Sequence, residues 1–189
     1  LPRFSRPRTI RTRRNNGKDS PRVALFRDLF ARYNSPELAQ IVVTLIEELT
    51  GSEVLVTDLG SCGITAMAYG NTGSAFRVLE NNLDELSRLV AEGYTVVSQE
   101  PTSVLTLRAE APGWSADPRW KNVAANTFEL FEYLRKMEAG GRMRPLPDDP
   151  RLEMKLAYHM PCHLKALQIG RPGLDFMKRI DGLEIVESR

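Results

Sequence analysis

Short apolar runs alternate with amphipathic helical patterns along most of this chain, and that alternation restricts the fold more than any other feature. The apolar runs suit buried strands, at residues 22–26, 53–56, 94–98, 154–159 and 184–186. Helical spacing of apolar residues falls between them, at about 36–50, 73–92, 101–108 and 126–138. A helix between two strands connects them by a right-handed crossover, which makes the strands parallel. The sequence therefore predicts an α/β fold, with a mainly parallel sheet and helices on both faces.

Capping residues and prolines set the expected ends of these elements. Ser35 and Pro36 are typical of a helix start, and Gly51 is typical of a helix end. The stretch 112–118 contains two prolines and a glycine, so it predicts a loop.

Charge is distributed unevenly along the chain. Of its 26 basic and 24 acidic residues, residues 1–22 hold eight basic and one acidic, which leaves 18 basic and 23 acidic in the rest. Residues 1–22, called the arm below, have several prolines and few apolar side chains, which is typical of an extended linker. Its charge also suits phosphates or an anionic lipid surface, but no aromatic platform or recognition helix accompanies it. We expect a linker or partner contact, and no specific nucleic-acid partner.

The composition restricts the class of protein. A length of 189 residues and a hydrophobic content of 42% are those of a globular protein. Two cysteines are too few for a disulfide scaffold. The sequence has no apolar run long enough to span a membrane and no signal-peptide pattern. We therefore expect a cytoplasmic protein.

Two parts of the sequence resemble each other. The segment 23–54 matches 156–185, because each reads as an apolar strand, a helix started by a proline (Pro36 or Pro172), a glycine and a second strand. A duplication predicts four parts: an arm at 1–21, a first repeat at 22–140, a linker at 141–153 and the beginning of a second repeat at 154–189.

Chemically capable side chains follow several of the expected strands, where open α/β sheets place their sites. Residues 60–63 set Cys62 between glycines, which allow a tight turn that exposes the sulfur; a buried, inert cysteine fits the same pattern. Residues 100–103 offer hydroxyls and amides at a helix start, suited to an anion or a thiolate. Simple N-capping is the alternative for that segment.

A third segment, His159-Met160-Pro161-Cys162-His163, holds two imidazoles and a thiol within five residues. These are metal ligands, although a four-coordinate site needs partners from elsewhere. The alternative is a turn whose histidines cap the following segment. Because all three segments follow strands of a parallel sheet, we expect their loops to gather at one edge of it.

Several of these motifs together resemble a known family. They are Phe26 and Asp28, Pro36-Glu37, Ser61-Cys62-Gly63, Tyr69-Gly70-Asn71, Glu100-Pro101-Thr102-Ser103, Glu132-Tyr133-Leu134 and Tyr158-His159-Met160-Pro161-Cys162-His163-Leu164. The set resembles the cysteine-rich CCG domain of the B subunit of heterodisulfide reductase, of the iron–sulfur subunit of anaerobic glycerol-3-phosphate dehydrogenase, and of lactate and glycolate oxidation proteins. The resemblance covers residues 22–189. The arm resembles the junction behind ferredoxin-like and FAD-linked oxidase domains in fused members.

The resemblance implies a redox role. In that family, duplicated cysteine motifs hold an iron–sulfur cluster or, in some copies, zinc, and pass electrons between a flavin and an acceptor. It implies FAD on an upstream domain or partner, a flavin-containing dehydrogenase and a ferredoxin-like domain as partners, and peripheral membrane association through them. The substrate it implies is a 2-hydroxy acid (lactate or glycolate) or glycerol 3-phosphate.

Carried onto this sequence, the family's cofactor positions are Cys62, Cys162, Ser61, Ser103 and Asp28, and the metal-capable side chains are Cys62, Cys162, His159 and His163. Asp28, Ser61 and Ser103 stand where the family pattern has cysteines. Thiolate-ligated clusters use about four cysteines, and serine and aspartate are weaker ligands for the iron of such clusters. We expect this chain alone to hold no cluster and to have no activity. Two functions stay open: an electron-transfer module of a flavin-linked dehydrogenase, or a degenerate, cofactor-free structural or docking domain.

Overall fold

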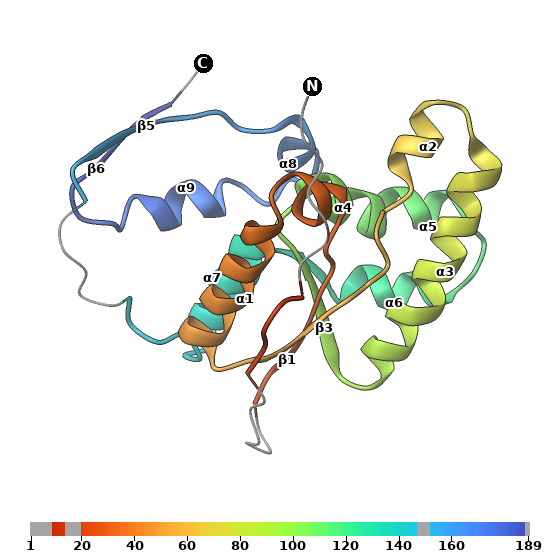
Figure 1. Ribbon diagram of the computed structural model, residues 1–189, viewed down its shortest axis with the longest axis horizontal. Helices are drawn as coiled ribbons and strands as arrows, with labels where there is room; N and C mark the ends of the chain where they lie inside the picture. Colours follow the sequence, from red (N-terminus) through yellow and green to blue (C-terminus); the bar gives the residue numbers. More distant parts are fainter. Residues whose placement is uncertain (1–8, 14–19, 147–151, 188–189) are drawn as a thin grey trace.

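The computed structural model describes residues 9–13, 20–146 and 152–187, and it confirms the predicted α/β fold (Figure 1). Its main sheet has parallel strands in the order β2-β1-β3-β4. They are β1 (Arg22–Leu25), β2 (Glu53–Val56), β3 (Tyr94–Ser98) and β4 (Thr127–Glu129). Because β1 lies between β2 and β3, the loops that follow these three strands emerge side by side at one edge of the sheet.

Helices cover both faces of the main sheet, as the sequence predicts. They are α1 (Pro36–Thr50) and α7 (Leu130–Ala139) on one face, and α3 (Thr72–Ala91) and α6 (Arg119–Ala125) on the other. Strand β1 is covered on both faces, because Val23 and Leu25 pack with α1 and α7 while Ala24 packs with Leu89 of α3. A strand covered on both faces is continuously apolar, which explains its sequence. Within the described ranges, no helix combines the length and apolarity needed to cross a membrane.

Several segments differ from the sequence prediction, which gave no helix at 64–68 or 119–125. Residues 127–129, predicted as the start of a helix, pair with β3 as strand β4, and the helix begins only at Leu130. Glu129 accounts for this boundary, because its carboxylate accepts hydrogen bonds from the first amides of α7. The predicted loop at 112–118 begins within helix α5 (Ala111–Trp114). That helix follows α4 (Pro101–Leu105) and a π-helical segment, η2 (Thr106–Glu110).

The carboxyl-terminal part forms a second, smaller unit. Strands β5 (Met154–Tyr158) and β6 (Leu183–Glu187) pair in parallel, with α8 (Cys162–Ala166) and α9 (Pro172–Met177) between them. The register of β1 and β2 recurs here. The pairs Arg22–Glu53, Val23–Val54 and Ala24–Leu55 correspond to Lys155–Glu184, Leu156–Ile185 and Ala157–Val186. The two matching sequence segments thus have the same strand pairing.

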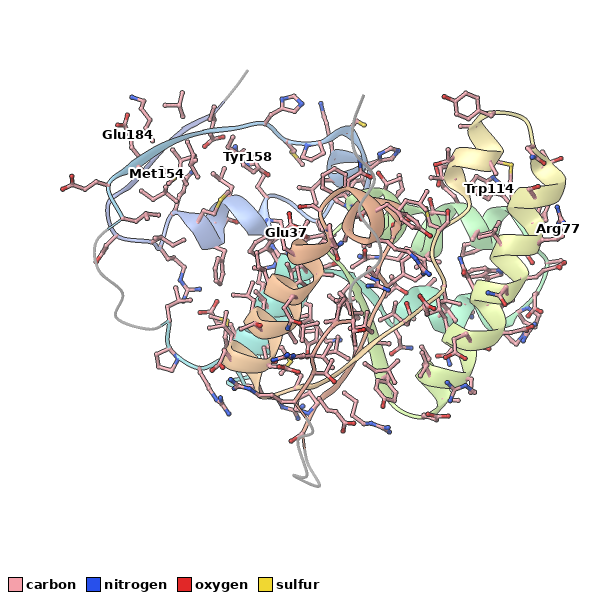
Figure 2. All side chains as sticks on the ribbon, viewed as in Figure 1. Glu37, Arg77, Trp114, Met154, Tyr158 and Glu184 are labelled. Atoms are coloured by element: carbon pink, nitrogen blue, oxygen red, sulfur yellow. The ribbon has the colours of Figure 1, made fainter. Side chains whose placement is uncertain are left out.

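The second sheet is covered less than the first. Lys155 and Glu184 form an exposed ion pair across β5 and β6, and Met154 is 47% exposed. Figure 2 labels Met154 and Glu184 on this second sheet. The unit packs on the main sheet's helices, with α9 against α7 and α8 against α4. At the first of these contacts the rings of Phe131 and Phe176 lie 5.3 Å apart between centroids.

Residues 9–13 lie outside both sheets and run along the surface of α1. The backbone N–H of Arg11 donates to Oε1 of Gln40 at 2.8 Å, and Nε2 of Gln40 donates back to the Arg11 carbonyl at 3.0 Å. The N–H of Arg13 donates to the carboxylate of the buried Glu47 at 2.7 Å. The remaining parts of the predicted arm, at 1–8 and 14–19, lie outside the described residues, as does the 147–151 stretch of the predicted linker.

Candidate functional site

Three of the predicted cofactor positions meet above the carboxyl ends of adjacent strands. Asp28 follows β1, Cys62 lies in the loop after β2, and Ser103 belongs to the first turn of α4, after β3. All three side chains are buried. The hydroxyl of Ser103 donates to Oδ2 of Asp28, and Oδ1 of Asp28 accepts from the Leu29 amide at 2.6 Å. The strand order places these loops together, because β1 is the central member of the three.

The environment of Cys62 keeps its thiol protonated. Burial first, and the negative charge of Asp28 second, raise the pKa of Cys62 to about 12. A thiol is a nucleophile and a metal ligand only as the thiolate, so Cys62 in this state is neither. Of the two interpretations of the sequence, a buried and inert cysteine therefore describes Cys62 better than an exposed and reactive one.

The loop that carries Cys62 is held by its own backbone and by α3. Gly60 and Gly63 have φ values of +85° and +88°, which favour glycine at both positions. The Gly63 amide donates to Oγ of Ser61 at 3.1 Å, and Nδ2 of the buried Asn82 donates to the Ser61 carbonyl at 2.8 Å. Ser61 therefore bonds within its own turn, just before α2 (Ile64–Ala68).

Glu100 is a second carboxyl group beside this cluster, and sequence reasoning quoted it only as part of a motif. Burial first, and the charge of Asp28 second, raise the pKa of Glu100 to about 7. Its Oε1 accepts weak hydrogen bonds from the Ala31 amide and from Nε2 of Gln99, each at 3.4 Å. The signal in the sequence was an acid placed directly before a proline at a strand-to-helix junction.

The third predicted segment lies on the neighbouring side of α4. Nδ1 of His163 is 3.1 Å from Oγ1 of Thr102 and 3.7 Å from Sγ of Cys162. Cys162 and His159 are exposed, in contrast to the buried Cys62. Thr102 and Ser103 are consecutive in the first turn of α4. Thr102 contacts the second unit, and Ser103 contacts the buried cluster.

The predicted site residues thus form two groups with different surroundings. Asp28, Cys62 and Ser103 form a buried, hydrogen-bonded group, whereas Cys162 and His163 form a surface pair against Thr102. The two cysteines, both in the described part of the chain, form no disulfide. Across the described ranges, no three His, Cys, Asp or Glu side chains are grouped so as to hold a metal ion. The buried group can exchange hydrogen bonds, and the surface pair offers a thiol and an imidazole to an incoming partner.

The sequence has relatives among known proteins. The chain is similar to the C subunit of anaerobic glycerol-3-phosphate dehydrogenase from Escherichia coli strain K12 and from Escherichia coli O157:H7. It is 27% identical to each over 167 residues, which is 86% of this chain and 40% of each relative. The chain therefore spans less than half the length of the relatives that it matches. No model of a protein family matches the sequence, and no solved structure matches it.

Proposed function

We propose that this chain is part of an electron-transfer subunit of a flavin-linked dehydrogenase. The observation that carries the proposal is the similarity to the C subunit of anaerobic glycerol-3-phosphate dehydrogenase, which extends over 86% of the chain. The meeting of Asp28, Cys62 and Ser103 adds support, because these motif positions are distant in sequence and adjacent in the fold.

The proposal assigns partners and a substrate class to the larger assembly. The electron donor is a flavin-containing dehydrogenase domain or subunit that holds FAD, and a ferredoxin-like domain is a further neighbour. The substrate is glycerol 3-phosphate, in line with the relatives' name, or a 2-hydroxy acid such as lactate or glycolate. An iron–sulfur cluster of that assembly would carry the electrons.

The donor set of the first unit does not fit a thiolate-ligated cluster. It offers one sulfur, that of Cys62, and its environment favours the protonated thiol. The carboxylate and hydroxyl beside it are hydrogen-bonded to each other. Iron–sulfur clusters are held by about four thiolates, and oxygen ligands replace sulfur poorly.

This mismatch favours a second candidate function for the described portion: a cofactor-free structural or docking unit. In that role the Asp28–Ser103 hydrogen bond replaces ligand bonds and fixes the loops after β1 and β3. The exposed Cys162, with His163 and Thr102 beside it, then belongs to a contact between units.

Reconstitution with iron and sulfide separates the two candidates. The purified chain is treated under anaerobic conditions beside a variant that combines Asp28→Cys, Ser61→Cys and Ser103→Cys, and iron, sulfide and visible absorption are measured. We expect the unchanged chain to take up no stoichiometric cluster and the triple variant to take up iron. A control that combines Ser35→Cys, Ser74→Cys and Ser87→Cys adds the same number of thiols elsewhere and should bind none. A complete cluster in the unchanged chain would contradict the docking role.

Capture from the native host tests the electron-transfer role itself. The tagged chain should retain a protein with bound flavin, detected by its fluorescence after release. Glycerol 3-phosphate, lactate or glycolate should bleach that flavin anaerobically. Retention of no flavoprotein would overturn the electron-transfer proposal and leave the docking role to be tested by the reconstitution.

A further inference from the structure

Two arginines turn their guanidinium groups toward one aspartate at the carboxyl ends of β1 and β2. The side chains of Arg27 and Arg32 are 8% and 16% exposed, whereas that of Asp58 is 78% exposed. Oδ1 of Asp58 is 2.6 Å from Nη1 of Arg32 and 3.5 Å from Nη2 of Arg27. A single carboxylate oxygen thus serves two cations that are largely withdrawn from water.

This arrangement uses only part of what the Arg32 guanidinium can bind. A guanidinium presents its five N–H donors in a planar fork that matches the oxygens of carboxylates and phosphates. Arg32 reaches both the carboxylate and the carbonyl of Asp58 through Nη1 alone. Its Nε is buried, and no acceptor among the described residues bonds it. A partner with several oxygens would offer the Arg32 guanidinium more acceptors than Asp58 does.

Asp58 is also a weak partner in its own right. A carboxylate that stands mostly in water gains little from an ion pair, because solvent and salt screen the attraction. The cations, in contrast, are fixed by burial and cannot turn away. An anion from solution therefore competes with Asp58 for a site that is already formed.

The surrounding backbone leaves room for this cluster. Gly60 has a left-handed φ of +85°, and a Cβ at that position would lie 3.4 Å from Nη1 of Arg32. The cluster stands at the sheet edge where open α/β folds bind ligands. It is separate from the buried Asp28–Ser103 pair, although Arg27 and Asp28 are adjacent in sequence.

We propose that Arg27 and Arg32 form a binding site for a divalent oxyanion, namely a phosphate group, and that Asp58 occupies this site in the absence of the anion. The anion takes the place of the Asp58 carboxylate on the two guanidiniums, and Asp58 moves into solvent. The site depends on neither an iron–sulfur cluster nor the electron-transfer role.

Titration with inorganic phosphate, followed by calorimetry and by thermal shift at low ionic strength, tests the proposal. We expect the unchanged chain to bind with a Kd of about 1 mM, as for a single weak ionic contact. Asp58→Asn removes the internal competitor without adding a cation and should tighten binding about fivefold. Arg32→Gln should weaken it at least about tenfold. Methyl phosphate that binds as well as inorganic phosphate would assign the site to the phosphoryl group of a larger ligand, and weaker binding would assign it to the free ion; both support the site.

Two further variants make the result specific. Arg88→Gln removes the same charge from an exposed arginine of α3, paired with Glu85 and Glu92, and should leave binding within about twofold. Arg32→Lys keeps the charge but loses the planar fork, so it should weaken binding even if Arg32→Gln fails to fold. Equal losses in Arg32→Gln and Arg88→Gln would mean that only net charge matters, and the proposal would be wrong. Weaker or unchanged phosphate binding in Asp58→Asn would overturn it as well.

Discussion

Glu100 and Glu129 stand at the carboxyl ends of the neighbouring strands β3 and β4, and both retain protons up to neutral pH. Burial is the leading cause in each case, and it raises the pKa of both carboxyls from the ordinary 4.5 to about 7. The folded chain therefore binds protons that the unfolded chain has released. The stability that these groups contribute is fully present below pH 4.5 and is lost as the pH rises through about 7.

Glu129→Gln tests this pH dependence at one residue. Glutamine keeps an oxygen acceptor for the Phe131 and Glu132 amides but cannot ionise. Between about pH 5 and pH 7, we expect the free energy of unfolding to decline less in the variant, by on the order of 1 kcal/mol. Urea denaturation across that range measures the decline.

The control for this experiment is Asp117→Asn. A hydrogen bond from Arg119 lowers the pKa of Asp117, so the contribution of Asp117 is lost only below its ordinary value of 3.8. The control should keep the slope of the unchanged chain between about pH 5 and pH 7. An identical slope in Glu129→Gln would show that Glu129 is already ionised in the folded chain.

Motif positions could be predicted at this scale, but their partners could not. The positions of Asp28, Cys62 and Ser103 follow from the family resemblance, and their shared sheet edge follows from strands in parallel. The contact between Thr102 and His163 depends on how α8 docks on α4, which no local pattern encodes. The pairing of Arg27 and Arg32 with Asp58 escaped sequence reasoning for the same reason.

At the scale of elements, residues 9–13 are held to α1 mainly by backbone hydrogen bonds, beside one exposed ion pair between Arg13 and Glu48. Gln40 bonds both the N–H and the carbonyl of Arg11, and Glu47 bonds the N–H of Arg13. Ile10 packs against the core that α1 covers. The composition of residues 1–22 indicated an extended linker. It did not indicate that residues 9–13 bind to α1, because nothing in the sequence distinguishes Gln40 from other polar residues on a helix surface.

Gln40→Ala should release this segment to proteases. The variant loses two hydrogen bonds to Arg11, so we expect trypsin to cleave after Arg11 and Arg13 about fivefold faster, since local opening becomes less costly. Mass spectrometry of timed digests measures the rates. Asn81→Ala, an exposed amide on α3, is the matched control and should change nothing.

Glu48→Ala gives a graded comparison for the same segment. It removes only the exposed ion pair with Arg13, so its effect on cleavage should be smaller than that of Gln40→Ala. Equal cleavage rates in all of these chains would show that the hydrogen bonds of Gln40 do not hold the segment.

The long periodic helix α3 and the mainly apolar strands β1, β2 and β3 were predictable, whereas β4 and α5 were not. The prediction of a helix at 73–92 is matched by α3, which begins at Thr72 and ends at Ala91. Strand β4 has three residues, too few for a pattern of period two, and its pairing with β3 decides its conformation. Helix α5 contains Pro112 and Gly113, residues that normally end helices, but the preceding turns of α4 and η2 continue into it.

On the scale of the whole molecule, the two units meet where α9 packs against α7. Gly173 lies in the first turn of α9, and a Cβ there would stand 3.0 Å from the ring of Phe131. That ring also packs on Phe176. The fit leaves no room for a methyl group unless Phe131 moves.

Gly173→Ala should therefore loosen the contact between the units. We expect it to lower the free energy of unfolding by about 1–3 kcal/mol through overpacking. Gly113→Ala is the matched control, because nothing lies within 4 Å of a Cβ at Gly113 in α5. Alanine there should stabilise by about 0.5 kcal/mol through the lower entropy of the unfolded chain. Urea denaturation compares the two, and equal stabilisation by both would mean that the Phe131 contact is not tight.

The first turn of α4 connects the buried group around Cys62 to the second unit. The hydroxyl of Ser103 donates to Asp28 at the sheet edge, and Thr102 contacts His163 in the second unit. One peptide bond joins Thr102 and Ser103. Packed interiors transmit strain, so a displacement of α8 either breaks the contact between Thr102 and His163 or also shifts Ser103. We therefore expect a displacement of the Cys162–His163 pair to reach the side chains packed around the thiol of Cys62.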